Sequence, residues 1–420
     1  MIASPFPLER DLGMCWYWTD SPGIGGTLKK SAEDFVVEEL SAFIPGEGPY
    51  VIVRLVKRNW ELHHAVKEIA RALGISHRRI GWAGTKDRRA LTTQLISVYN
   101  VDPARIRDVH LRDITLEVLG QAPHALSLGM LTGNRFSLWI RECIGTDLQP
   151  VVAAVASAAE RGLPNYFGVQ RFGVIRPITH VVGLHLLRGD MEGAALTYIA
   201  RPFPGEPQEV AEARSAFGIT RDTREALRTF PVHMTYERSM LHHLQARPGD
   251  YAGAIAVLPP KLRSLFISAY QSSLFNHALS TRIGKGISLD TPVPGDMLLY
   301  PDGKMDTVEP ASMRAAAMQV SRGRAVIAIL MPGGGAIRQP VSAAVQDQLT
   351  CDGISPESFR NAAAWAGVAF HGAPRPIAIS PQIRYTIEGN DVFLEFALGP
   401  GQYATTICRE FMKADPALMA

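Results

Sequence analysis

A short polar run, Gly84-Thr85-Lys86-Asp87-Arg88-Arg89, places one carboxylate among three cations. Because nearby positive charge favours the ionised form of an acid, we expect Asp87 to be ionised. An ionised aspartate in a loop can act as a nucleophile, accept a proton or stabilise a cationic centre. A surface ion-pair cluster that caps a strand would have the same composition. The run alone therefore indicates a candidate site and does not identify a reaction.

The same run ends a segment that is rich in basic residues. Between positions 54 and 89 there are ten Lys and Arg residues and three acidic ones, a balance of +7, whereas the net charge of the 420-residue chain is only +3. A phosphate-rich ligand would gain affinity from such a patch through counterion release. A solvated helix face is the alternative. The basic residues are Arg54, Lys57, Arg58, Lys67, Arg71, Arg78, Arg79, Lys86, Arg88 and Arg89.

No common metal or cofactor motif accompanies this segment. The sequence has no GxxxxGK[ST] loop, no GxSxG elbow and no HExxH helix. The adjacent pairs His63-His64 and His242-His243 have diverging side chains, so one metal ion could hardly bind both members of a pair. We therefore expect neither a metal ion nor a cofactor.

The composition is that of a globular protein, with 46% hydrophobic and 20% charged residues and a length typical of two or three domains. The four cysteines are far apart, which favours free thiols in a reducing compartment. No run of about 18 apolar residues and no secretory signal pattern occurs. We expect a cytoplasmic protein without membrane contact, and a monomer, since nothing in the sequence demands a second subunit.

The residues around the polar run predict a support for it. Apolar positions spaced by three and four over 64–73 predict an amphipathic helix that ends at Gly74. Segments rich in β-forming residues flank this helix. A layer of strand, helix and strand would present the polar run in a loop, where functional side chains are common. The strands are expected at 35–39, 50–56, 80–83 and 92–99.

Residues 135–141 predict a further strand with one buried face, because Phe136, Leu138 and Ile140 alternate with the residues between them. A Gly-, Pro- and aromatic-rich segment at 163–173 changes the composition abruptly and indicates a domain boundary. Other strands are expected at 114–119, 291–308, 325–331, 383–386 and 392–396, and helices at 148–161, 178–188, 190–200, 222–229, 237–245, 262–282 and 403–411.

Several segments together resemble the TruD family of tRNA pseudouridine synthases. They follow the family's order and span nearly the whole chain, and the segment at 164–173 is distinctive by itself. Ala32 replaces a proline of the family pattern, which affects backbone shape more than chemistry. The segments are KKSAEDFVVE at 29–38, GTKDR at 84–88, GNRFSL at 133–138, PNYFGVQRFG at 164–173, QSSLFN at 271–276 and GQYAT at 401–405.

The resemblance implies an α+β fold with two domains. Residues 1–170 and 375–420 would form the pseudouridine synthase catalytic domain around a mixed, largely antiparallel sheet. Residues 171–374 would form an inserted α/β TRUD domain, in the larger version of archaeal and eukaryotic-type members. A cleft would receive the tRNA.

The resemblance also implies the reaction. Uridine, expected at position 13 of tRNA, would be isomerised to pseudouridine: the N-glycosidic bond breaks, the base rotates and a carbon–carbon bond forms at C5. No cofactor is needed. Asp87 matches the catalytic carboxylate, which would attack C1′, remove the 2′ proton or attack C6 of the base.

Other positions match by motif. Phe136 would stack on the target base, although the pattern alone favours a core residue. Asn134 would position Asp87 or the base edge, or be a turn residue beside Gly133. Lys29 would pair with Asp87 or a phosphate, or be an exposed cation. For RNA binding we expect Lys86, Arg88 and Arg171; the segment around Arg171 could equally serve interdomain packing. The target base would have to be flipped into the pocket.

Two other functions stay open. A catalytically silent tRNA-binding or folding chaperone could keep this scaffold, although the polar run at 84–89 argues against it. A hydrolase could break the same glycosidic bond, but hydrolases usually need a second carboxylate, and none lies near Asp87 in this run.

Overall fold

The computed structural model describes residues 1–145, 147–335 and 340–419. By its contacts the chain divides into two compact units. We call Thr19–Leu163 with Ser380–Ala420 the sheet unit, and Met1–Trp18 with Pro164–Ile379 the helical unit. The first residues thus lie in the helical unit, where the Cys15 amide donates to Ser280 Oγ at 3.1 Å. That the units correspond to a catalytic and an inserted domain stays a prediction.

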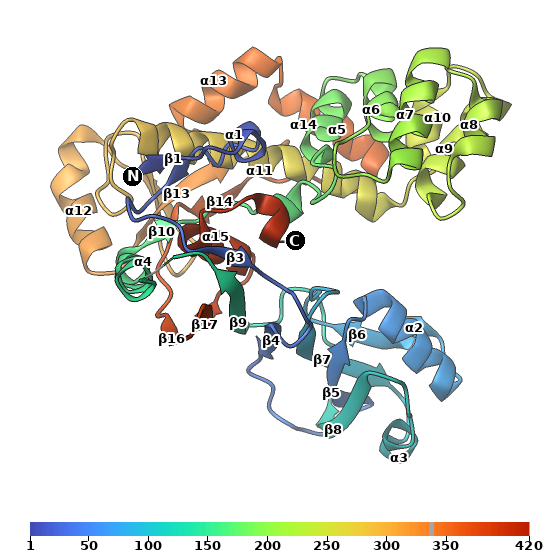
Figure 1. Cartoon of the computed structure of the whole chain (residues 1–420), viewed down its shortest axis with the longest axis horizontal. Coiled ribbons are helices and arrows are strands. Elements are labelled where there is room, and N and C mark those ends of the chain that lie inside the picture. Colours follow the sequence, from blue (N-terminus) through green and yellow to red (C-terminus); the bar gives the residue numbers. More distant parts are fainter. Residues whose placement is uncertain (146, 336–339, 420) are drawn as a thin grey trace. The chain divides into compact units, whose positions relative to one another are not determined.

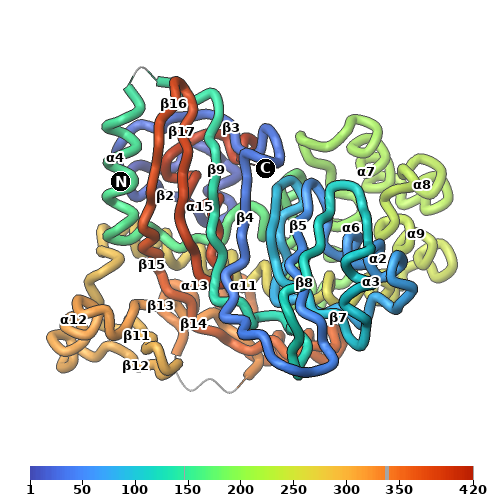
Figure 2. Tube along the Cα trace, turned by 90° about the horizontal axis from the view of Figure 1, so that it is seen from below, coloured from blue at the N-terminus to red at the C-terminus, as the bar shows by residue number. Residues whose placement is uncertain are grey.

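The sheet unit is built on a nine-stranded sheet. Its main path has the order β16-β17-β9-β4-β7-β5-β8, and β3 and β6 pair with β9 and β7; Figure 2 shows β16, β17, β9 and β4 side by side. Among the described strands of this sheet, β4 and β7 pair in parallel and the other pairs are antiparallel. The mixed, largely antiparallel sheet is therefore confirmed. The strands are β3 (Gly25–Thr27), β4 (Phe35–Leu40), β5 (Tyr50–Arg58), β6 (Ile80–Trp82), β7 (Leu91–Tyr99), β8 (Ile114–Ala122), β9 (Gly133–Cys143), β16 (Arg384–Glu388) and β17 (Asp391–Leu398).

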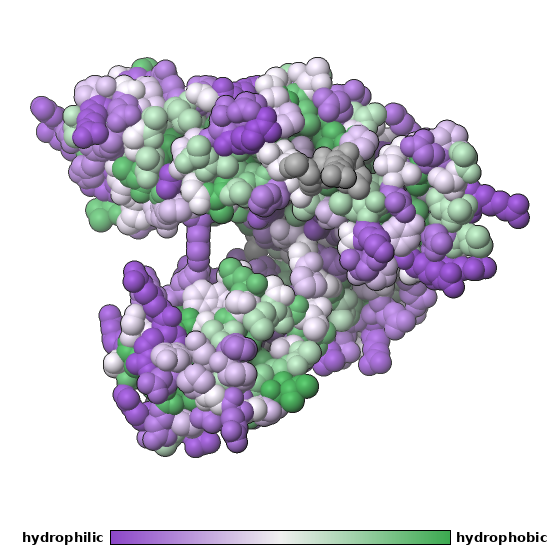
Figure 3. Space-filling view, turned by 180° about the vertical axis from the view of Figure 1, so that it is seen from behind, coloured by the Kyte–Doolittle hydropathy of each residue, from purple (hydrophilic) through white to green (hydrophobic). Residues whose placement is uncertain are grey.

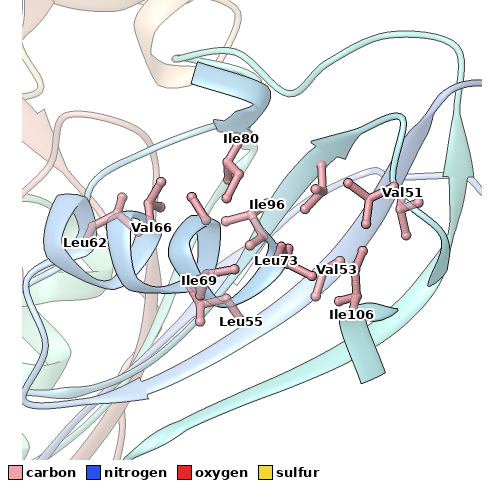
Figure 4. Packing of buried hydrophobic residues seen from close by; sticks show 13 residues of the cluster. Val51, Val53, Leu55, Leu62, Val66, Ile69, Leu73, Ile80, Ile96 and Ile106 are labelled. Carbon is pink, nitrogen blue, oxygen red and sulfur yellow. The ribbon is translucent and has the colours of Figure 1, made fainter. Parts of the chain in front are cut away.

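One half of this sheet is covered by α2 (Leu62–Leu73). The Glu61 side chain accepts from the His64 amide at the start of the helix, and Gly74 ends it in the left-handed region at φ 64°. Apolar side chains of α2 pack on β5 and β7 (Figure 4). The spacing of three and four in the sequence therefore predicted this helix and its buried face correctly.

The other half carries α4 (Gln149–Arg161) and α15 (Ala404–Met412), which contact each other. Phe136, Leu138 and Ile140 of β9 are buried, as the alternation predicted, whereas Arg135, the residue before Phe136, is exposed. The short helix α3 (Pro103–Arg107) contacts β8.

The helical unit combines many helices with a small antiparallel sheet of order β12-β11-β13-β14. Helices α5 to α10 lie together (green in Figure 1), and the long α11 packs against α5. The helices are α1 (Pro7–Asp11), α5 (Thr179–Leu187), α6 (Met191–Ala200), α7 (Gln208–Thr220), α8 (Thr223–Thr229), α9 (Thr235–Ala246), α10 (Tyr251–Ala256), α11 (Pro260–Gly284), α12 (Met313–Ser321), α13 (Ala343–Asp352) and α14 (Pro356–Ala366). The strands are β1 (Ile2–Ala3), β2 (Trp16–Tyr17), β11 (Met297–Leu299), β12 (Met305–Thr307), β13 (Val326–Met331), β14 (Ala373–Pro376) and β15 (Ala378–Ile379), and β10 (Leu163–Pro164) follows α4.

The surface is mixed in character. Figure 3 shows hydrophilic side chains over much of the visible face, with smaller hydrophobic areas among them. A search of the described residues finds no helix with the length and apolar character needed to cross a membrane.

Candidate active site

The polar run at 84–89 forms the loop between β6 and β7, as the sequence predicted. Both ends of the loop are anchored, because Ala83 is 2% and Ala90 is 0% exposed. The amide of Asn59 also donates to the carbonyl of Ala90 at 3.1 Å. Between these anchors the side chain of Asp87 is 45% exposed. A fixed backbone thus presents a carboxylate to solvent.

Lys29 is the cation next to this carboxylate. Its Nζ lies 3.7 Å from Asp87 Oδ2, and its side chain is only 6% exposed. The ammonium also lies 4.4 Å from the centre of the Phe35 ring, and Lys29 has a left-handed backbone at φ 56°. Arg89 donates to the Lys29 carbonyl at 3.3 Å. Lys29 is thus a buried cation held beside Asp87 and not an exposed strand-end residue.

Lys86 points toward the sheet. Its Nζ lies 2.7 Å from Glu39 Oε2, and the two side chains are 4% and 1% exposed. Glu39 Oε1 also accepts from the amide of Leu95 at 3.3 Å. In this structure Lys86 therefore fastens the loop to β4, whereas Arg88 is exposed to solvent.

The residues predicted to meet the base lie on the same sheet face. In register, Glu39 of β4 lies opposite Asn134 of β9, and Val37 lies opposite Phe136. Asn134 Oδ1 is buried and has no hydrogen-bond partner among the described residues. The ion pair of Lys86 with Glu39 and the register of β4 with β9 thus link the Asp87 loop to the position of Asn134.

Phe136 is packed between two other aromatic rings. It is 7% exposed, its ring centre lies 5.6 Å from that of Phe396 at 28°, and it meets Phe35 edge-on at 6.3 Å. Parallel stacking on one side and an edge contact on the other are favourable aromatic geometries. The core role that the alternation favoured is therefore present in the structure, and stacking on a base stays a prediction.

The ten basic residues between 54 and 89 do not form one solvent-facing patch. Lys57 is 0% exposed and Lys86 is paired as described. Arg54, Arg58 and Arg71 form ion pairs with carboxylates, two of which come from distant segments. Lys57 and Lys86 are thus turned away from solvent, and phosphate binding by the rest of the segment stays a prediction. The partners are Glu117 for Arg54, Glu33 for Arg58 and Glu68 for Arg71.

Arg171 belongs to the helical unit, whereas Asp87 belongs to the sheet unit. Its Nε donates to Ser272 Oγ at 3.2 Å. Neighbouring residues of the 164–173 segment are buried against α11: the Phe167 amide donates to Asn276 Oδ1 at 2.8 Å. Packing within the helical unit is thus the observed role of this segment, and RNA binding by Arg171 stays a prediction.

Sequence reasoning missed two buried charged residues near the loop, Glu39 and Lys57. Lys57 Nζ donates to the carbonyls of Trp60 at 2.7 Å and Asp87 at 3.0 Å. The period of two in β5 was the available signal, because it places Lys57 on the face of Val53 and Leu55. Among the described residues, no group of three or more His, Cys, Asp and Glu side chains could hold a metal ion.

Comparisons with known proteins agree with this architecture. The family model "tRNA pseudouridine synthase D (TruD)" matches residues 11–411. Proteins from Methanosarcina barkeri and Methanococcoides burtonii, each named "Probable tRNA pseudouridine synthase D", are 37% and 38% identical; the alignments cover 98% of this chain and 99% of each relative. A crystal structure of a TruD protein from Methanosarcina mazei matches with a TM-score of 0.82 and 37% identity over 98% of this chain and 99% of that chain. The chain therefore belongs to the tRNA pseudouridine synthase D (TruD) family.

Proposed function

We propose that this protein isomerises a uridine of tRNA, expected at position 13, to pseudouridine, with Asp87 as the catalytic carboxylate and without a cofactor. The observation that carries the assignment is the half-exposed Asp87 side chain beside the buried ammonium of Lys29. An ionised carboxylate on a fixed loop can act as nucleophile or base toward a bound nucleoside.

The other residues receive roles that follow from their surroundings. Lys29 orients the Asp87 carboxylate, and Asn134, whose Oδ1 has no partner among the described residues, binds the base edge or Asp87. Phe136 contributes a ring against the base. Arg88 contacts phosphate. We assign the same role to Arg171, and we expect Lys86 to reach RNA only if its pair with Glu39 opens.

Mapping of pseudouridine by carbodiimide modification tests the proposal. Purified protein is incubated with unmodified tRNA, and a tRNA with cytidine at position 13 is the control. We expect one new modification at position 13 of the first tRNA and none there in the control. Binding without a product would indicate an RNA chaperone, and release of uracil would indicate a glycosidic hydrolase. A monomer in the cytoplasm stays our expectation.

A further inference from the structure

Lys57 occupies a position at which an apolar residue is expected. Val51, Val53 and Leu55 alternate along β5 and belong to the buried cluster that β5 shares with α2 (Figure 4), and Lys57 is next in this row. Its side chain is 0% exposed. Burying an ammonium is unfavourable unless hydrogen bonds compensate for the lost hydration. A lysine in this place therefore needs strong partners.

Its partners are two main-chain carbonyls in different loops. Lys57 Nζ donates to Trp60 O, in the connection from β5 to α2, and to Asp87 O, in the loop between β6 and β7. The same two connections are joined by the hydrogen bond from Asn59 N to Ala90 O. Hydrogen bonds from an ionised donor are roughly twice as strong as neutral ones. One buried ammonium thus fixes the peptide unit of Asp87.

The opposite end of the loop is held in a similar way. Gln94 of β7 is 1% exposed, and its Nε2 donates to the carbonyl of Gly84 at 3.1 Å. Lys57 and Gln94 both donate to main-chain carbonyls, so neither side chain donates to the carboxylate of Asp87 in these hydrogen bonds. Buried side chains therefore hold the main chain of the loop at Gly84 and at Asp87 by hydrogen bonds.

We propose that Lys57 is a positioning residue for catalysis, which holds the Asp87 peptide so that the carboxylate stays beside Lys29. This inference rests on the proposed function of Asp87. A misplacement of about 1 Å in an active site can reduce the rate on the order of 100-fold. Loss of Lys57 should therefore act on the chemical step and leave tRNA binding largely intact.

The charges around Lys57 give the proposal a pH signature. Burial lowers the pKa of Lys57 to about 8. The positive charge of Lys86 also lowers this pKa, whereas the negative charges of Asp87 and Glu61 raise it. Below pH 8 the ammonium is charged and both bonds are strong. Above pH 8 the amine becomes neutral, the bonds to the carbonyls weaken, and the rate should fall.

The test compares Lys57→Met with Lys261→Met, which removes the same charge from an exposed residue of α11. Single-turnover pseudouridine formation is measured from about pH 6.5 to about pH 9, on both sides of the pKa of about 8. The affinity for tRNA and the hydrogen exchange of each loop are measured as well. We expect Lys57→Met to lose on the order of 100-fold in rate, with an unchanged tRNA dissociation constant and faster exchange at 84–89. The decline near pH 8 should be present in the wild type and in Lys261→Met, and absent from Lys57→Met.

A Lys57→Met rate within about threefold of the wild type would overturn the proposal, as would a decline near pH 8 that persists in this variant. If Lys57→Met does not fold, the pH profile of the wild type decides: no decline near pH 8 refutes the proposal, and a decline supports it. An inactive wild type would instead refute the proposed function itself, so the two failures are distinct.

Discussion

Lys86 and Glu39 form an ion pair in which both side chains are almost completely buried, with 2.7 Å between Nζ and Oε2. Removing one charge from such a pair leaves the other buried without compensation, which typically costs about 3–5 kcal/mol. We expect Glu39→Gln to lower the free energy of unfolding of the sheet unit by roughly this amount and to loosen the Asp87 loop. Urea unfolding followed by hydrogen exchange in β4 and β9 measures the effect.

The neighbouring residue of β4 offers a matched control. Glu38 pairs with Arg135, but both side chains are 51% exposed, and exposed pairs contribute only about 0–1 kcal/mol. Glu38→Gln should therefore change the free energy of unfolding by less than about 1 kcal/mol. Equal effects of the two substitutions would contradict a special role of the buried pair.

Asp87→Asn should abolish pseudouridine formation while tRNA affinity changes little. The amide keeps the size of the side chain and removes the charge beside Lys29, so the reaction loses its nucleophile or base. Single-turnover assays with saturating enzyme and filter binding separate the two effects. Appreciable single-turnover activity of the variant would rule out Asp87 as the catalytic carboxylate.

Arg88→Ala should weaken tRNA binding and make it less dependent on salt. Arg88 is exposed in the loop next to Asp87, and each phosphate contact contributes about 0.9 to the slope of log affinity against log salt concentration. We expect the slope to decrease by about 1. Arg384→Ala is the control, since this side chain is 88% exposed on β16 and pairs with Glu395. Wild-type binding that does not respond to salt would argue against phosphate contacts altogether.

Local periodicity explains which parts of the fold could be predicted. The spacing in α2 and the alternation in β9 are properties of short segments, so the sequence indicates both elements and their buried faces. Helices α1, α7, α10, α12, α13 and α14 of the helical unit were missed. Their buried apolar positions are few, as in α7 with Val210, Ala213 and Phe217, and such helices depend on tertiary packing.

The sequence predicted which residues lie at the candidate site better than it predicted how their side chains are oriented. The motif located Asp87 and Lys29, which the structure brings within 3.7 Å. The orientation of Lys86 and Lys57 was not predictable from charge, because Lys86 pairs with Glu39 and Lys57 donates to the carbonyl of Asp87, and both partners are far away in the sequence. The ion pair of Arg54 with Glu117 was not predictable for the same reason, because the two residues meet only when β5 pairs with β8.

Asn276 of α11 should be important for stability and not for chemistry. Its side chain is 0% exposed, accepts from the Phe167 amide at 2.8 Å, and donates to the carbonyls of Phe167 and Leu12 at 3.0 Å each. Asn276→Ala removes these three hydrogen bonds, and a typical hydrogen bond contributes about 0.5–1.5 kcal/mol. We expect the helical unit to lose on the order of 3 kcal/mol, measured by urea unfolding. Asn361→Ala, at an exposed position of α14, should be neutral, and similar stability of both variants would show that this network contributes little.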